Sequence, residues 1–281
     1  LQIAPNILPD SYQWKKKVLR RNILALKISL LNQGVRISDY AIQNMKNKGM
    51  IRQGVFQSVD LKFNNGIVIN APYLTDFSVM SPFEIDFNGK NYILKYYNRY
   101  LETISFDTLD TNRNKIASNG TMYGNVTFLA TDRLRVHHQF RCYFKMHDQG
   151  CKFCNVKPKE GNYDLSDVFE IIDFYLNNVD FRHFLIGGGS GKAEIEQNNI
   201  MAIASYIRKH TKKPIYAMCL PPENIEVLEE YKKNGINEIS FNIEIFNRKI
   251  ARTTMPGKGK IPLKQYENAL KKAVELWGSS G

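Results

Sequence analysis

The sequence predicts an α/β protein in which an N-terminal α+β domain rich in antiparallel strands precedes a parallel β/α domain. Two observations support this prediction. Short alternating segments separated by Asn, Gly, Asp and Pro turns fill residues 54–135, which is typical of antiparallel strands. From residue 136 onward, apolar runs alternate with amphipathic segments, which is typical of parallel strands joined by helices. We therefore predict domains at residues 1–135 and 136–281.

The N-terminal domain begins with two predicted helices. Residues 11–35 carry an apolar stripe at helical spacing, and residues 38–49 lie between Ser38 as N-cap and Gly49 as C-cap. The strand-like segments that follow are GIVINAPYL, FEIDF, NYILKYY, ETISFDT, GNVTFLA and RLRVHHQF. An Asn-Gly pair within DFNGKNYIL predicts a hairpin turn. This domain carries no motif that assigns it a role, so substrate binding, peptide delivery and covering of the second domain all stay open.

The second domain has alternating predicted strands and helices. The strands are expected at residues 136–143, 182–187, 213–219 and 237–245, and the helices at about 165–178, 193–210, 222–234 and 262–277. Short connections between them predict a parallel sheet, in which ligands bind at the carboxyl ends of the strands. A sheet of these strands alone would be bare at its edge. We expect either further strands beyond residue 281 or a cover from the N-terminal β segments.

Composition and charge narrow the class of protein. No run approaches the length of a membrane-spanning helix and the first segment lacks a signal-peptide cleavage pattern, so we expect a cytoplasmic protein that does not contact the membrane. In such a reducing compartment, clustered thiols favour metal or redox chemistry over disulfides. The net charge of +12 indicates an anionic partner, such as nucleic acid, a phosphorylated substrate or an acidic peptide. The basic residues are spread over helix surfaces, so nucleic acid is permitted but not favoured.

Three of the four cysteines lie close together, in HHQFRCYFKMHDQGCKFC at residues 137–154. Cys142 ends the first predicted strand of the second domain, and Cys151 and Cys154 lie in the loop after it. Thiolates at this spacing can share one metal centre. A structural zinc ion would need a fourth ligand, for which His147 and His138 are candidates. An iron–sulfur cluster accepts three cysteines and leaves one iron open. Both alternatives stay open on the cysteines alone.

A glycine run, FLIGGGSGK at residues 184–192, ends the second predicted strand. It is not a Walker phosphate loop, because Ile186 stands where that loop needs its first glycine and Ala193 where it needs Ser or Thr. A tight turn between strand and helix also accounts for the glycines.

Polar residues alternate along the fourth predicted strand, EISFNIEIFN at residues 238–247. Ser240, Asn242 and Glu244 are expected to share one face of this strand. If that face points into a barrel, Glu244 needs a partner, because burying an unpaired carboxylate is costly. In a one-sided antiparallel sheet the same face would meet water. The stretch RTTMPGKGK follows the strand.

The order of these motifs resembles the radical S-adenosylmethionine (radical SAM) superfamily. Phe153 before Cys154 matches the Cys-x-aromatic-Cys half of the superfamily's cluster loop. The gap between Cys142 and Cys151 is wider than usual, so we expect it to bulge outward, with Gly150 allowing the return turn. The resemblance covers residues 136–281 and implies a partial parallel (β/α) barrel of the radical SAM type.

The resemblance also implies the cofactors and their ligands. A [4Fe-4S] cluster would be held by Cys142, Cys151 and Cys154, and S-adenosylmethionine (SAM) would bind at its open iron. The residues implied to contact SAM match two motifs. In the glycine-rich turn they are Gly187, Gly188, Gly189 and Ser190, the last of which stands where an acidic residue is frequent. On the fourth strand they are Asn242 and Glu244, and after it Arg252 or Lys258 toward the SAM carboxylate.

The implied activity is reductive cleavage of SAM to a 5′-deoxyadenosyl radical, which abstracts hydrogen from an unidentified substrate. The implied partners are an electron donor such as a flavodoxin or ferredoxin and a substrate for which the charge permits an anion. Two alternatives stay open. One is a zinc-stabilised nucleic-acid-binding protein, supported by the charge and by His137, His138 and His147. The other is a non-catalytic relative that keeps the cluster as a structural element. Cys219 is expected to be a small core residue.

Overall fold

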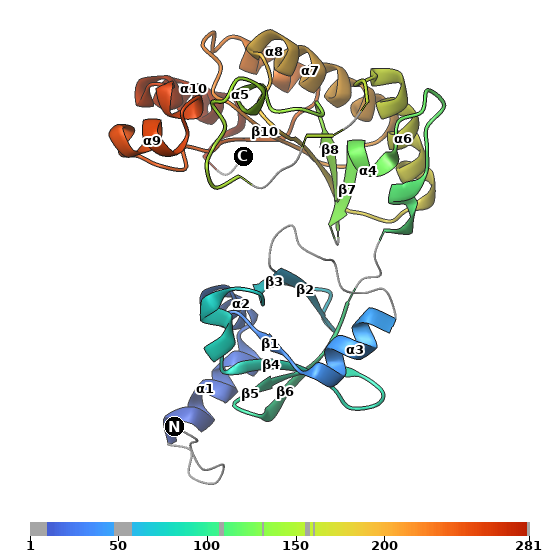
Figure 1. Cartoon of the computed structure of the whole chain (residues 1–281), viewed down its shortest axis with the longest axis vertical. Coiled ribbons are helices and arrows are strands. Elements are labelled where there is room, and N and C mark those ends of the chain that lie inside the picture. The colour runs from blue at the N-terminus through green and yellow to red at the C-terminus, as the bar shows by residue number, and fades with distance from the viewer. Residues whose placement is uncertain are drawn as a thin grey trace. The chain divides into compact units, whose positions relative to one another are not determined.

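The computed structural model describes residues 10–47, 58–106, 110–130, 132–154, 158–159 and 161–279. The chain forms two compact units, Leu1–Leu109 and Asp110–Gly281, and each has its own hydrophobic core. Their elements are labelled in Figure 1. The boundary therefore lies between residues 109 and 110, and not between residues 135 and 136 as predicted. Residues 110–135 join the second unit because β7 (Thr127–Ala130) pairs with β8 (Arg133–His137).

Among its described residues, the first unit packs three helices on a six-stranded sheet. Its helices are α1 (Asp10–Arg21), α2 (Ile23–Gln33) and α3 (Asp39–Asn47), with a 3-10 turn η1 (Asp76–Met80). Its strands are β1 (Arg36–Ile37), β2 (Ser58–Phe63), β3 (Val68–Pro72), β4 (Phe83–Phe87), β5 (Tyr92–Tyr96) and β6 (Arg99–Ser105). They lie in the order β1-β4-β5-β6-β2-β3, and every pair is antiparallel except β1 with β4.

Two local predictions in this unit have different outcomes. The single helix predicted over residues 11–35 is wrong, because Asn22 interrupts it and its side-chain oxygen accepts the Ala25 N–H at 3.1 Å as the N-cap of α2. The hairpin at the Asn-Gly pair is confirmed: it joins β4 to β5, and Gly89 takes the positive φ of 90° that such a turn requires. The predicted cap Gly49 lies outside the described residues.

The second unit is a five-stranded sheet with the order β11-β10-β9-β8-β7. The further strands are β9 (His183–Gly187), β10 (Ile215–Cys219) and β11 (Glu238–Phe241). Strands β8 to β11 pair in parallel, and β7 is antiparallel to β8. The helices are α4 (Tyr123–Val126), α5 (Tyr143–Met146), α6 (Leu165–Asn178), α7 (Ala193–His210), α8 (Val227–Lys233), α9 (Arg248–Thr254) and α10 (Leu263–Trp277), with 3-10 turns η2 (Thr111–Asn114) and η3 (Lys258–Lys260).

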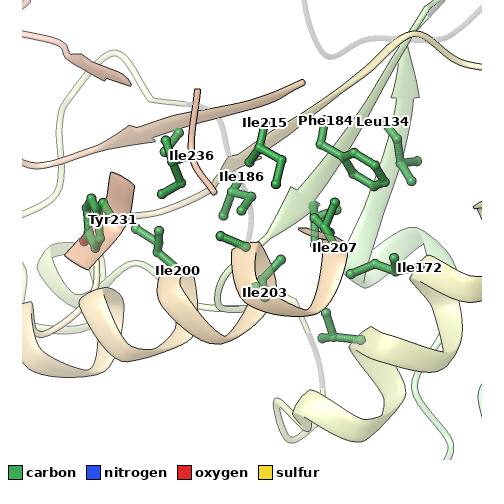
Figure 2. Packing of buried hydrophobic residues seen from close by; sticks show 14 of the residues in the cluster. Leu134, Ile172, Phe184, Ile186, Ile200, Ile203, Ile207, Ile215, Tyr231 and Ile236 are labelled. Atoms are coloured by element: carbon green, nitrogen blue, oxygen red, sulfur yellow. The ribbon is translucent and has the colours of Figure 1, made fainter. Parts of the chain in front are cut away.

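Helices α6, α7 and α8 lie along one face of this sheet (Figure 1). The core between helices and sheet is drawn in Figure 2, where isoleucines of α7 point at alternate residues of the strands. The strand residues include Leu134, Phe184, Ile186 and Ile215, all fully buried. Because successive side chains of a strand point to opposite faces, the residues between them lie on the other face of the sheet. No helix among the described residues has the length and apolar character needed to cross a membrane.

Candidate functional site

The three cysteines lie in the loop that follows β8, at the carboxyl edge of the parallel strands. Cys142 is the N-cap residue of the short helix α5, so it does not end the strand, which stops at His137. Cys151 and Cys154 lie beyond α5 in one turn, in which the Cys154 N–H donates to the Cys151 carbonyl at 3.1 Å. All three thiols are partly buried and free of disulfides.

The cysteines converge on a shared region despite the long gap between them. Burial raises the pKa of the Cys151 thiol, and the neighbouring Cys154, Cys142 and Glu244 raise it further, while Lys258 lowers it. Charge effects of this kind require close approach. Glu244 and Lys258, two predicted site residues from after β11, therefore lie near the cysteine loop.

The turn that brings the loop back between Cys142 and Cys151 differs from the prediction. Asp148, and not Gly150, takes the left-handed conformation, with a φ of 56°. The Gln149 N–H then donates to the Phe144 carbonyl at 2.7 Å, and Lys145 Nζ donates to the Cys154 carbonyl at 2.7 Å. Glycine is needed at position 150 for a different reason: a Cβ there would lie 2.7 Å from Lys145 Cγ.

The glycine run packs directly against the cysteine loop. A Cβ at Gly189 would lie 2.7 Å from Cys142 Cβ and 2.9 Å from its Cα, so no side chain fits there. The Tyr143 N–H donates to the Ser190 carbonyl at 2.7 Å, and Gln139 Nε2 donates to the Gly189 carbonyl. Gly187 and Gly188 have more space, because their nearest contacts would be at 3.5 and 3.7 Å. The close approach to Cys142 thus explains glycine at position 189.

The predicted strand residues Asn242 and Glu244 lie beyond the strand. Strand β11 ends at Phe241, and Glu244 has a φ of 63°, so the expectation that both share a strand face with Ser240 is wrong. Polar and apolar residues go on alternating in the sequence after Phe241, although β11 no longer pairs with β10 there. Asn242 Nδ2 lies 3.5 Å from the Met218 sulfur. Glu244 is exposed, and its Oε1 pairs with Lys258 Nζ, which is largely buried, at 3.2 Å.

The segment around Lys258 is fastened to the cysteine loop. The Lys152 N–H donates to the Thr254 carbonyl, and the Gly257 N–H donates to the Gln149 carbonyl, both at 2.9 Å. By contrast, Arg252 lies on α9 with its side chain exposed, and it is not among the groups that act on Cys151. The structure brings Lys258 to the cysteines but does not bring Arg252 there.

The sequence analysis missed Arg248, the first residue of α9. Its Nε, Nη1 and Nη2 atoms are all buried and have no hydrogen-bond partner among the described residues. Burial raises the pKa of Tyr266, Arg248 lowers it, and Glu244 and Cys151 raise it. Arg248, Glu244 and Cys151 thus all act on the Tyr266 hydroxyl. Nothing in the sequence distinguishes it from the exposed basic residues nearby, because burial depends on how α9 packs.

The histidines do not complete a zinc site. His147 is exposed, its ring lies 4.1 Å from that of Tyr143, and its Nδ1 is 2.8 Å from the Tyr143 carbonyl. His138 is buried beneath Gly188. Neither is among the groups that act on Cys151. Within the described part of the chain, no three His, Cys, Asp or Glu side chains are arranged to hold a single metal ion. Cys219 packs at the edge of the core, and burial raises its pKa well above the ordinary value.

Comparison with known proteins gives one match. The model of the Radical SAM superfamily matches residues 137–279, just over half of the 281-residue chain. No curated protein and no solved structure matches the chain. The matched region begins in β8 and contains the cysteine loop, the glycine run and the segment from Asn242 to Lys258.

Proposed function

Because the chain belongs to the radical SAM superfamily, a superfamily of enzymes, we propose that it cleaves SAM reductively with a [4Fe-4S] cluster held by Cys142, Cys151 and Cys154. The observation that carries this proposal is the packing of the cysteine loop against the glycine run at Gly189 and its hydrogen bonds to the Thr254–Gly257 segment. When bound, the cluster supplies the electron that splits SAM into methionine and a 5′-deoxyadenosyl radical, which takes a hydrogen atom from the substrate.

The donor set fits a cluster better than a single zinc ion. Three thiols without a fourth protein ligand leave one iron of a four-iron cluster open. A zinc ion would need its ligands within about 2.3 Å of one point, and the described side chains offer no such arrangement of three metal-binding groups. A cluster spreads its thiolates farther apart than one ion does. The partial burial of the three cysteines also limits access of water.

The glycine run and the residues after β11 would orient SAM. The carbonyls of Gly189 and Ser190 already accept hydrogen bonds from Gln139 and Tyr143. We therefore assign the amino group of SAM to the Gly188 carbonyl, one residue earlier in the turn. Asn242 remains our candidate for the ribose.

We assign the carboxylate of SAM to Arg248 in place of Arg252. Lys258 is already paired with Glu244, and Arg252 is exposed. The Arg248 guanidinium is buried and unbonded among the described residues, and a buried unpaired charge is costly. A carboxylate can satisfy it through two parallel hydrogen bonds. Electrons would come from an external donor such as a flavodoxin or ferredoxin.

Iron and sulfide analysis of anaerobically purified protein tests the proposed cluster. The parent protein should contain about four irons and four sulfides per chain, as a [4Fe-4S] centre requires. Cys151→Ala should lose most of this iron, since two thiolates hold the cluster poorly. Cys219→Ala removes a thiol from the end of β10 that is not among the groups acting on Cys151, and it should keep the iron. A colourless parent protein that binds one zinc ion per chain would refute the proposal.

A further inference from the structure

The face of the second sheet that points away from the helices carries positive charge. Along β8, Leu134 and Val136 point into the core beneath the helices. Arg133, Arg135 and His137 alternate with them and therefore share the opposite face, which we call the cationic face. The strand register places Leu185 of β9 beside Arg135, and Tyr216 of β10 beside Leu185.

The strand register also puts Glu238 of β11 on this face, and Glu238 and Asp132 act on His183 at one end of it, but no carboxylate of the described residues acts on Arg135 or His137. Burial and the neighbouring Arg133 lower the pKa of Arg135, and no carboxylate opposes them. Burial, Arg135, Lys159 and His138 lower the pKa of His137 to about 3. Every charged group that acts on these two residues is thus basic. Because an arginine stays protonated in a protein, the charge of Arg135 persists.

The two arginines of this face also leave buried donor atoms without hydrogen-bond partners among the described residues. The Nε atoms of Arg133 and Arg135 are buried and unbonded among the described residues. A buried donor without a partner costs folding stability, and a buried unpaired charge costs more. The described residues do not offset this loss of stability, but a bound anion would.

Arg135 points toward the proposed SAM site. Its Nη2 atom lies 3.9 Å from the position that a Cβ of Gly187 would take. Gly187 begins the glycine run, and Gly189, two residues later, touches Cys142. The free end of the Arg135 side chain is therefore next to the turn to which we assign the amino group of SAM, on the same edge of the sheet as the cysteines.

We propose that the cationic face binds an anionic group of the substrate, a carboxylate or a phosphate, with Arg135 as its main ligand. The inference deepens the proposed function and rests on it, because it treats this face as the floor of the same site. Carboxylate and phosphate both match the planar guanidinium with two parallel hydrogen bonds. Either group would satisfy the donors and the charge that the described residues leave unmatched, and the net charge of +12 agrees with an anionic ligand.

Thermal unfolding of the full chain in the presence of simple anions tests this inference. The probes are inorganic phosphate and acetate, each compared with sodium chloride at equal ionic strength. A Trp14→Phe background leaves Trp277 of α10 as the fluorescent reporter for the second unit. At saturating concentration, phosphate or acetate should raise the unfolding midpoint by roughly 2–4 °C relative to chloride, since it binds only the folded state.

Arg135→Met should abolish this rise while keeping the length of the side chain. It should also leave the midpoint in chloride unchanged or higher, because it removes an unbalanced charge, whereas a structurally required arginine would lower it. The matched control is Arg182→Met. Arg182 is exposed and pairs with Asp132 at 2.9 Å on the surface, so this variant should keep the rise of the parent.

The choice of anion identifies the group: a larger rise with phosphate supports a phosphoryl group, and a larger rise with acetate supports a carboxylate. The inference is overturned if neither anion stabilises the parent more than chloride does, or if Arg135→Met keeps the full rise. Iron analysis of the same samples separates the two proposals. Protein that lacks iron but shows a rise dependent on Arg135 would refute the cluster and still support the anion site.

Discussion

The contact between the glycine run and the cysteine loop leaves no space for a Cβ atom at Gly189. A methyl group at position 189 would lie 2.7 Å from Cys142 Cβ, whereas one at position 187 would meet nothing closer than 3.5 Å. The first distance is too short for carbon atoms, and the second is an ordinary contact. The cost of adding the same methyl group should therefore differ sharply between two glycines of one turn.

We expect Gly189→Ala to displace Cys142 and to weaken retention of the cluster by about tenfold or more, the usual effect of disturbing the support of a metal ligand. Gly187→Ala is the matched control and should keep the iron content of the parent. Iron per chain after desalting in the absence of oxygen provides the measurement. Equal iron in both variants would show that the contact with Gly189 does not position Cys142.

Burial separates Arg248 from Arg252, although both lie on the same short helix. We expect Arg248→Met to weaken SAM binding by about tenfold to a hundredfold, because it removes charge-assisted hydrogen bonds to a carboxylate. Arg252→Met should leave the affinity within about twofold of the parent, as is usual for an exposed charge. Anaerobic titration calorimetry without reductant measures both. The opposite order would restore Arg252 as the ligand.

His138 makes the stability of the second unit sensitive to acid. Burial, followed by the effect of Arg135, lowers its pKa from 6.5 to about 4. Above pH 6.5 the histidine is neutral in both states, so stability is complete there. As the pH falls from 6.5 toward 4, His138 becomes protonated in the unfolded state but stays neutral in the folded state, so the free energy of unfolding decreases. We expect a loss of about 2 kcal/mol between pH 7 and pH 5 from this residue.

Urea unfolding at the two pH values, in the Trp14→Phe background, measures this loss through Trp277 fluorescence. The His138→Gln variant has no group at this position that titrates in the range, so its stability should fall by about 2 kcal/mol less than that of the parent. Parallel losses in the parent and the variant would mean that His138 is protonated in the folded state.

At the scale of elements, the sequence predicts the long helices well and the strand ends poorly. The predicted bounds of 165–178 and 193–210 coincide with α6 and α7, because both are amphipathic and their ends are marked by polar or glycine-rich segments. Strand β11 stops four residues before its predicted end at residue 245, although alternation continues. The alternation of polar and apolar residues is a property of the local sequence. The end of a strand is instead set by where the neighbouring strand stops pairing with it, and that depends on residues far away in the sequence.

One buried carboxylate ties three elements of the site together. Glu196 of α7 is 4% exposed and accepts the N–H of Gly191 after the glycine run and the N–H of Leu220 after β10, the latter at 3.1 Å. A glutamine offers only one accepting oxygen, so one of these buried donors would lose its partner.

We expect Glu196→Gln to lower the free energy of unfolding by about 1–3 kcal/mol and to weaken SAM binding by loosening the glycine turn. Glu194→Gln changes an exposed residue of the same helix turn and should alter stability by less than about 0.5 kcal/mol. Urea unfolding followed by Trp277 fluorescence compares them. If the two variants unfold alike, Glu196 does not fasten the ends of β9 and β10.

At the scale of the whole molecule, the sequence predicts two units but misplaces their boundary. Strand β7 alternates like the strands of the first unit, and only its pairing with β8 assigns it to the second. The site is predictable to a similar extent. The cysteine and glycine motifs are visible in the sequence, whereas Arg248 and Arg135 stand out only because packing leaves buried nitrogen atoms of both without a hydrogen-bond partner among the described residues. Their importance follows from burial, which no local pattern encodes.

The measurement that most directly tests the central claim is the formation of 5′-deoxyadenosine from SAM by the anaerobic, reduced protein. It needs no knowledge of the substrate, because slow cleavage without substrate still yields this product. We predict that the parent and Cys219→Ala form it and that Cys142→Ala, Cys151→Ala and Cys154→Ala do not. A protein that holds a full cluster and binds SAM, yet yields no 5′-deoxyadenosine or other cleavage product, would contradict the account and leave the cluster a structural role.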